Sequence, residues 1–185
     1  EAKKVLDSMT YTDDIVMKAS SVPAMPPLKN IPSLKDATAT AEKAQADLDK
    51  LNAEKAPYPV VRSAECTLIG ANFLKEMAAS VERVGDLESI LSDQLPLEVM
   101  AFRLGDCVFS CVSCENFVEV SKEVKDNSPF KYTFMSSLTN GNTRGYICAD
   151  YAYDEFCYEA QASSFAKGAV QALVDGCLQA IHNVQ

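Results

Sequence analysis

The first half of the chain, residues 1–94, carries its apolar residues at helical spacing. Residues 1–9 predict the tail of a helix, as expected if the chain continued upstream, and Ser33-Leu-Lys-Asp36 is a capping-box pattern that marks the start of a second one. After that pattern, apolar residues recur at alternating spacings of four and three, up to about Lys55. This spacing predicts a charged helix with one narrow apolar stripe, formed by Ala37, Ala41, Ala44, Leu48 and Leu51.

A further helix is predicted over residues 64–84, after Pro57 and Pro59 interrupt the pattern. Its apolar face is expected to consist of Ile69, Phe73, Met77 and Val81. Two helices joined by a short proline-containing linker predict an antiparallel helical hairpin. The apolar stripes could bind a partner helix, but packing within the protein's own core explains them better.

Strand patterns flank this hairpin. Residues 14–22 predict a strand, closed by Pro23 because proline cannot donate to a ladder. From Leu97 the apolar residues alternate, and residues 102–106 predict a turn that leads into a strand at 107–112. The two segments around that turn predict a β-hairpin.

The remaining segments alternate between helix and strand. Residues 115–124 have helical spacing, with Phe117, Val118, Ser121 and Val124 along one side, and 130–138 predict a strand. Asn140-Gly141-Asn142 is a turn signal. Residues 163–182 predict a final helix with Val170, Val174, Cys177 and Ile181 facing inward. The sum is an α/β (α+β) fold, with a mixed sheet flanked by helices and an N-terminal helical hairpin.

A chain of 185 residues is long enough for one domain with its own core. We therefore expect residues 1–185 to form a single domain or a partial domain. Residues 1–94 would supply a strand and the helical hairpin, and residues 95–185 a strand–helix–strand region.

Charge narrows the class of partner. The formal net charge is −9, from 17 basic and 26 acidic residues, and the basic residues do not cluster. Nucleic-acid binding is therefore not expected, nor is adhesion to anionic membranes. No apolar run approaches the length of a membrane span. The sequence starts at Glu1 rather than at Met, so an export signal could have been removed, and localisation stays open.

Seven cysteines are present, an odd number, and three of them form the series Cys107, Cys111 and Cys114. A structural zinc site usually needs four thiolate or imidazole ligands, and neither a second pair of cysteines nor a nearby histidine accompanies this series. On a strand, Cys107 and Cys111 share one face with Phe109, which suits buried packing. We therefore interpret these thiols as packed rather than as a zinc or redox site.

Two residues stand where α/β proteins place their sites. Glu115 follows a predicted strand at the start of a predicted helix, and Tyr146 follows a glycine-containing turn after the next strand. A helix-start charge and a packed aromatic ring are the structural alternatives. A phenol becomes a good metal ligand only as a phenolate, which needs a nearby cation. No serine-nucleophile motif is present, and a capping or exposed role suits His182 better than that of a catalytic base.

The order of motifs from Leu97 to the final helix, about half of the chain, resembles the neutral (alkaline, non-lysosomal) ceramidase family. The resemblance begins with the segment 97–106, its following apolar strand and Glu115-Asn-Phe117. It continues through the motifs Ser128-Pro-Phe130, Thr133-Phe134, Asn140-Gly141, Gly145-Tyr146-Ile147 and Tyr158-Glu159.

This resemblance implies a hydrolase of sphingolipid metabolism, because the family consists of zinc amidohydrolases that cleave the amide of N-acyl sphingosine. Their zinc is held by two histidines from the N-terminal half of the catalytic domain and by a glutamate and a tyrosine from the C-terminal half. Glu115 and Tyr146 match these last two metal ligands. The chain would then be the C-terminal half of such a domain, inactive without the His-bearing half. A secreted or periplasmic location is also implied.

The resemblance carries further expectations about partners. The missing N-terminal half of the same catalytic domain would be the first, and a lipid amide the substrate of the active form. The surface that the missing half would cover should be apolar, so self-association into a homo-oligomer is also expected of the isolated chain.

Four positions depart from the family pattern. Ser113-Cys114 replaces Pro-Gly before the glutamate, Cys148 replaces a proline, and Cys157 replaces a glycine. These departures favour a second hypothesis, a degenerate, non-catalytic relative that acts as a binding or interaction domain. A third hypothesis is an unrelated α/β domain whose resemblance to the family arose by chance.

Overall fold

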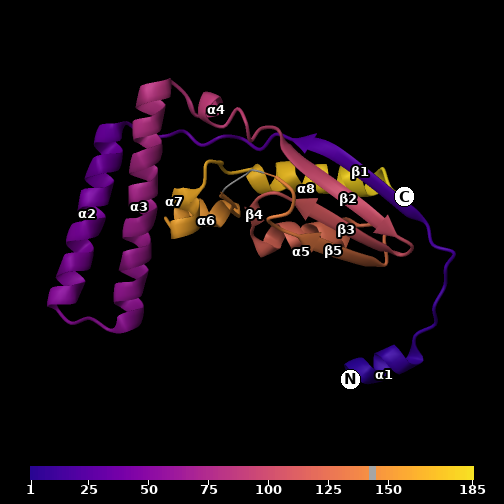
Figure 1. Cartoon of the computed structure of the whole chain (residues 1–185). Coiled ribbons are helices and arrows are strands. Elements are labelled where there is room, and N and C mark those ends of the chain that lie inside the picture. The colour runs from indigo at the N-terminus through magenta and orange to yellow at the C-terminus, as the bar shows by residue number, and fades with distance from the viewer. Residues whose placement is uncertain (142–144) are drawn as a thin grey trace.

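The computed structural model describes residues 1–141 and 145–185. The helices are α1 (Ala2–Ser8), α2 (Leu34–Ala53), α3 (Tyr58–Val84), α4 (Leu87–Ile90), α5 (Val118–Asn127), α6 (Asp150–Asp154), α7 (Tyr158–Ala162) and α8 (Ala169–His182). The strands are β1 (Met17–Ala24), β2 (Leu97–Leu104), β3 (Cys107–Val112), β4 (Glu115–Asn116), β5 (Tyr132–Ser136) and β6 (Tyr146–Ile147). The predicted α/β (α+β) fold, a mixed sheet flanked by helices with an N-terminal helical hairpin, is confirmed (Figure 1).

The main sheet has the order β1-β2-β3-β5. The first two pairings are antiparallel, and β3 pairs with β5 in parallel. The predicted end of β1 at Val22 is wrong, because Pro23 lies inside the strand opposite Glu98. Since β1 is an edge strand, a residue without an N–H costs no ladder hydrogen bond on its open side.

The β2–β3 hairpin turns on Gly105 and Asp106 alone. The predicted turn over 102–106 is therefore too long: β2 continues to Leu104, which pairs with Cys107. Gly105 has φ +59, the left-handed conformation that a tight hairpin turn requires. The extension places Phe102 on the sheet, opposite Phe109.

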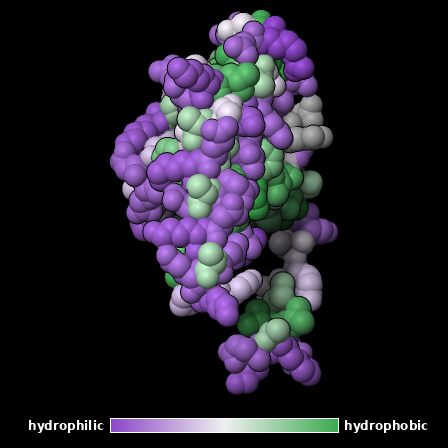
Figure 2. All heavy atoms as spheres, turned by 90° about the vertical axis from the view of Figure 1, so that its left-hand side faces the viewer, coloured by the Kyte–Doolittle hydropathy of each residue, from purple (hydrophilic) through white to green (hydrophobic). Residues whose placement is uncertain are grey.

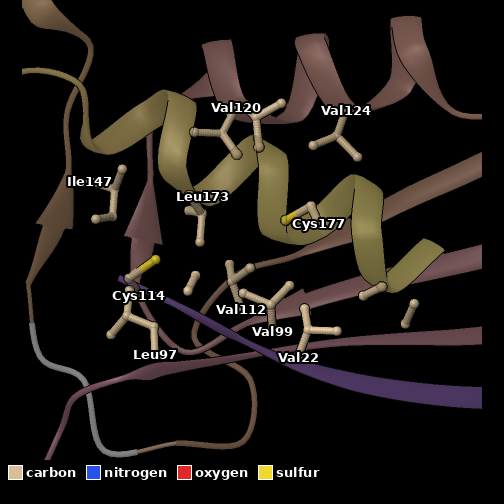
Figure 3. Close-up of a cluster of buried hydrophobic side chains, with 14 of the residues drawn as sticks. Val22, Leu97, Val99, Val112, Cys114, Val120, Val124, Ile147, Leu173 and Cys177 are labelled. Carbon is tan, nitrogen blue, oxygen red and sulfur yellow. The ribbon is translucent and has the colours of Figure 1, made fainter. Parts of the chain in front are cut away.

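Helix α8 forms the core with one face of this sheet, as Figure 3 shows. Leu173 and Cys177 of α8 lie between the strand residue Val99 and the α5 residue Val120, and all four side chains are fully buried. The helix approaches closely because Gly176 faces the sheet, where an added Cβ would lie 3.2 Å from that of Ala24. Val174 and Ile181 of α8 are also buried, as expected, whereas Val170 is only partly buried.

Two predicted helices begin later than expected. Helix α8 starts at Ala169 rather than at residue 163, because residues 163–168 form a non-helical segment in which Phe165 pairs with Leu28 as an isolated bridge. Helix α5 starts at Val118 rather than at Glu115, and it buries Val120 and Val124. Val118 itself is 73% exposed, so the buried side of α5 is rotated by part of a helical turn from the predicted one.

The opposite face of the main sheet carries exposed aromatic residues. Phe102, Phe109 and Phe134 stand side by side on β2, β3 and β5, and they are 36–46% exposed. The rings of Phe109 and Phe134 stack with their centroids 5.1 Å apart. The prediction that Cys107, Phe109 and Cys111 form a buried face is therefore wrong for Phe109, although Cys111 is buried.

Helices α2 and α3 form the predicted hairpin, which stands beside the sheet with α6 and α7 between them (Figure 1). The side chain of Ser33 caps α2 by accepting a hydrogen bond from the Asp36 backbone N–H, and the expected alanine stripe is buried. Helix α3 starts at Tyr58, six residues earlier than predicted, because proline is tolerated in a first helical turn. Figure 2 shows this side of the molecule, where hydrophilic residues predominate.

The buried face of α3 differs from the predicted one. It consists of the small residues Gly70, Ala71 and Ala78 together with Leu74. Ile69 and Phe73 are instead 41% and 45% exposed. Small side chains let α3 approach its neighbours, and an added Cβ at Gly70 would lie only 3.0 Å from Cβ of Gln161 on α7.

The N-terminal helix α1 lies apart from the body, and none of its residues is buried (Figure 1). Across the described residues, every helix falls short of the length and apolar character needed to span a membrane.

Candidate functional site

Glu115 and Tyr146 are brought together by a short second sheet. Strands β4 and β6 pair in parallel, with Glu115 opposite Tyr146 and Asn116 opposite Ile147. The Glu115 N–H donates to the Gly145 carbonyl oxygen at 3.1 Å. Residues in register on neighbouring parallel strands project to the same side, about 5 Å apart at the backbone. The carboxylate and the phenol therefore leave the backbone side by side.

This position follows from the topology of the main sheet. Strand β4 follows β3 in the chain and β6 follows β5, and β3 and β5 are parallel neighbours. The carboxyl ends of parallel strands meet at one edge of a sheet, so both residues arrive at the same edge. The expectation that Glu115 begins a helix is wrong, because two residues of strand and Phe117 precede α5.

Gly145 is required for the entry into β6. Its φ is +123, a conformation that residues with a side chain rarely adopt. The same residue supplies the carbonyl oxygen that accepts the Glu115 N–H. Glycine at this position thus sets both the direction of Tyr146 and its register against Glu115.

Polar side chains hold the two short strands in place. The Asn116 amide nitrogen donates to the Phe117 carbonyl oxygen, and the amide oxygen accepts from the Ser137 hydroxyl at 2.7 Å. On the other strand, the buried Ser163 hydroxyl donates to the Tyr146 carbonyl oxygen at 2.8 Å. These bonds compensate for the small number of ladder bonds that a two-residue strand makes.

The environment of Tyr146 disfavours the phenolate. Burial raises the pKa of Tyr146 to about 12, and the nearby negative charge of Glu115 acts in the same direction. Tyr158 and Glu159 contribute further in this sense. In this chain by itself, Tyr146 therefore remains protonated at physiological pH and can donate a hydrogen bond to an acceptor such as the Glu115 carboxylate.

An aromatic row leads away from this pair. The ring of Tyr146 meets that of Tyr158 edge-on, with 5.9 Å between centroids. The Tyr158 ring lies 6.3 Å from that of Phe73 on α3. The row ends at Phe73, which is 45% exposed on the side of α3 that faces α7.

The donors near Tyr146 fit only part of a zinc shell. Glu115 and Tyr146 offer two oxygens, whereas zinc sites normally include imidazole or thiolate ligands. Within residues 1–141 and 145–185, no group of three or more His, Cys, Asp and Glu side chains is placed to hold a metal ion. His182 bonds the Leu178 carbonyl oxygen through Nδ1, at the end of α8. The described residues therefore do not provide a complete set of zinc ligands, and an imidazole ligand beside Glu115 and Tyr146 would have to come from another polypeptide segment.

The cysteine series does not converge on one point. Cys111 lies on the outer face of β3, opposite Met100, while Cys114 lies in the core with Cys177. Burial raises the pKa of the Cys114 thiol to about 12, so it is not a thiolate at physiological pH. All seven cysteines are free thiols.

The cysteines at the positions that depart from the family pattern fit the backbone without strain. Cys157 has φ −70 as the residue before α7. Cys114 does not have a positive φ either. Among the described residues other than glycine, a positive φ occurs at Lys55, Leu138, Asn140 and Phe156. A side chain at either position therefore costs nothing in backbone conformation.

The turn signal at 140–142 lies partly outside the described residues, because Asn142 is not among them. Asn140 has φ +46, as the turn signal predicts. Gly141 packs directly on Ser113, and an added Cβ there would overlap the Ser113 side chain. This contact joins the loop after β5 to the segment that leads into Glu115.

Comparison of the chain with protein-family models and with curated proteins gives no match. The fold and the site define an α/β domain with a carboxylate–phenol pair at the carboxyl edge of its parallel strands. The ceramidase resemblance rests on the motifs quoted above.

Sequence reasoning missed two features around the site. The contact of Phe73 with Tyr158 lay on a helix face predicted to be buried. The exposed ladder of Phe102, Phe109 and Phe134 was also missed. Its signal was present in the sequence, because the even positions 100, 102 and 104 of β2 are as apolar as the odd positions 97, 99 and 101. A strand that is apolar on both sides must meet something on both sides.

Proposed function

We propose that the chain is the C-terminal part of a neutral-ceramidase-like zinc amidohydrolase, in which Glu115 and Tyr146 are two of the metal ligands. The observation that carries the proposal is the register of β4 and β6, which sets these two residues opposite each other. They are separated by thirty positions in the sequence, and both match family ligands.

The missing imidazoles would come from the N-terminal half of the catalytic domain. Bound zinc in such a site activates water and polarises an amide carbonyl. In this chain, Glu115 supplies a carboxylate ligand and Tyr146 a phenol that loses its proton only beside a cation. In the chain alone, burial raises the pKa of Tyr146, so a phenolate ligand would form only beside a bound cation.

The proposal includes a lipid amide as substrate and a secreted or periplasmic location, both from the family resemblance. The aromatic row of Tyr146, Tyr158 and Phe73 offers an apolar surface beside the candidate metal position, suited to an apolar chain. The net charge of −9 is compatible with a neutral amide and disfavours an anionic one.

The test is zinc binding and amide hydrolysis by the chain joined to the His-bearing half, encoded upstream or supplied as a separate polypeptide. We expect one zinc ion per complex, and we expect both Glu115→Gln and Tyr146→Phe to weaken binding by at least 10-fold. Loss of a metal ligand commonly has an effect of this size or more.

A second Glu–Tyr pair in the chain provides matched controls. The Tyr151 hydroxyl donates to the Glu119 carboxylate at 3.1 Å, away from β4 and β6. Glu119→Gln and Tyr151→Phe should leave zinc binding unchanged. If the four variants bind zinc equally well, Glu115 and Tyr146 are not ligands.

The alternative function is that of a degenerate, non-catalytic relative that binds a partner. It is favoured by the cysteines at positions 114, 148 and 157 and by the lack of a complete ligand set among the described residues. The sequence upstream of Glu1 discriminates between the two: two histidines in a matching N-terminal half favour the enzyme, and their absence favours the binding domain.

A further inference from the structure

The face of the main sheet that points away from α8 is apolar from the row of Phe102 to the β2–β3 turn. Alternate residues on the four strands point to this face. Six large apolar side chains there are between 36% and 70% exposed, namely Met17, Phe102, Leu104, Phe109, Tyr132 and Phe134. They form two adjacent rows across the sheet. Phe102, Phe109 and Phe134 lie opposite one another on neighbouring strands and form the first row, and Met17, Leu104 and Tyr132 lie in the second.

One end of this face is already closed. Asn140 donates its amide N–H groups to the Glu98 carboxylate and to the Met100 sulfur. Met100 and Cys111 are accordingly only 9% and 6% exposed on the same face. The open part therefore begins at the phenylalanine row and continues to the β2–β3 turn.

The open part has the size of the largest apolar patch on a typical monomer. An exposed side chain of these types presents about 200 Å², so the six residues leave on the order of 500 Å² of apolar side chain uncovered. The largest apolar patch on a typical monomer is about 300–600 Å² and often functional. Two such surfaces in contact would bury about 1,000 Å², which is the lower limit for a specific protein–protein interface.

Charge also indicates the kind of partner. Among the outward-pointing residues of the four strands, the charged one is Glu98, and it lies at the closed end, held by Ser21 and Asn140. A partner with a basic surface would therefore find no carboxylate to pair with on the open part. The surface that matches an apolar sheet face best is another such face, packed at about 10 Å as in β-sandwiches.

We propose that two copies of this chain associate through this outer sheet face, with the phenylalanine rows of the two copies in contact. A second copy is self-complementary by symmetry, because a twofold axis brings the same patch to both sides of the interface. The proposal does not depend on the zinc site, since Glu115 and Tyr146 lie on β4 and β6, outside the main sheet.

The salt dependence of this dimer has a defined sign. Each copy carries a formal net charge of −9, so the copies repel each other while the apolar faces attract. Salt screens the repulsion, with a Debye length of about 8 Å at 0.15 M. Dimerisation should therefore strengthen as the salt concentration rises, whereas binding to a basic partner would weaken.

The test is the mass of the chain in solution by light scattering and sedimentation, from about 1 to 200 μM. We expect a dimer with a dissociation constant on the order of micromolar, as for a small interface. Phe102→Asp and Phe134→Asp should each weaken dimerisation by at least 10-fold, because each buries a carboxylate in the apolar contact. A wild-type chain that is monomeric at 200 μM would overturn the proposal.

Tyr58→Asp is the matched control, since Tyr58 is 75% exposed at the start of α3 on the hairpin. It introduces the same charge away from the sheet and should leave the dimer intact. A dimer that survives both phenylalanine substitutions would show that another surface mediates association, and would overturn the assignment of the face.

Wild-type footprinting gives an answer that does not depend on how the variants fold. Oxidative labelling of Met17 and Tyr132 should fall several-fold between dilute and concentrated samples, while labelling of Tyr58 should not change. Equal labelling at both concentrations would contradict the proposal. So would a monomer that floats with zwitterionic lipid vesicles, because the occupant of the face would then be a lipid surface.

Discussion

Tyr146 holds its proton more tightly than an ordinary tyrosine, and burial is the main cause. Its pKa of about 12 lies above the value near 10 of an unfolded chain. The folded state therefore binds this proton more strongly. The resulting stability is present below pH 10 and is lost as the pH rises through 12.

We predict that Glu115→Gln lowers the pKa of Tyr146, because it removes the nearby negative charge that is the second cause of the shift. The measurement is the pH titration of ¹³Cζ-labelled tyrosine by NMR, with the Tyr146 signal assigned through Tyr146→Phe. Glu119→Gln is the control and should leave Tyr146 unchanged, since Glu119 contacts Tyr151 instead. An unshifted Tyr146 in Glu115→Gln would mean that the two side chains do not interact.

The sequence was enough to suggest that Glu115 and Tyr146 reach one edge of the sheet. Each follows a strand, and the carboxyl ends of parallel neighbours coincide. Their direct pairing could not be predicted, because a strand of two residues has no periodicity to detect. It depends on Gly145 and on two side-chain hydrogen bonds, one from Ser137 to Asn116 and one from Ser163 to Tyr146, which join residues 21 and 17 positions apart.

At the scale of secondary-structure elements, helices with a local signal were predicted best. The Ser33 cap and the alanine stripe of α2 predicted both its start and its buried face. For α3 the same method failed twice. Pro59 lies in the first turn of α3 and does not break the helix, and the predicted face of Ile69 and Phe73 is not the buried one. Close helix packing selected the small residues instead, such as Gly70 against Gln161.

The loop after β5 meets the segment before β4 at a single tight contact. We predict that Gly141→Ala destabilises the fold by about 1–3 kcal/mol, because its Cβ would overlap the Ser113 side chain. Urea denaturation followed by circular dichroism measures the change. Removing the opposing side chain with Ser113→Gly should restore part of the loss, which a double-mutant cycle reveals as a coupling energy. Additive effects would rule out this contact as the cause.

At the scale of the whole molecule, stability is concentrated in the sheet and α8. The buried cluster runs from Val22 on β1 to Val184 at the end of the chain, and α1 contributes nothing to it. The sequence predicted the helix at 1–9 but could not say that it lies apart from the body. Which face of the sheet the helices cover was likewise decided by long-range packing.

Deleting residues 1–9 should therefore shift the melting temperature by less than about 2 °C, since no buried side chain is lost. Deleting residues 181–185 is the comparison, because it also shortens one end of the chain but removes buried side chains. It removes Ile181 and Val184, both fully buried, and should lower the melting temperature by roughly 5 °C or more. Differential scanning calorimetry compares the two. A larger effect of the N-terminal deletion would contradict the described packing.

The position of β1 in the sheet has a consequence for the time course of folding. Its partner is β2, so Ala24 pairs with Leu97, more than 70 residues later in the chain. During synthesis the edge strand must wait for its neighbour, while the α2–α3 hairpin between them can form from local contacts alone. Once folded, the hairpin brings the end of β1 closer to the start of β2, so the loop that must close before the two strands pair becomes shorter.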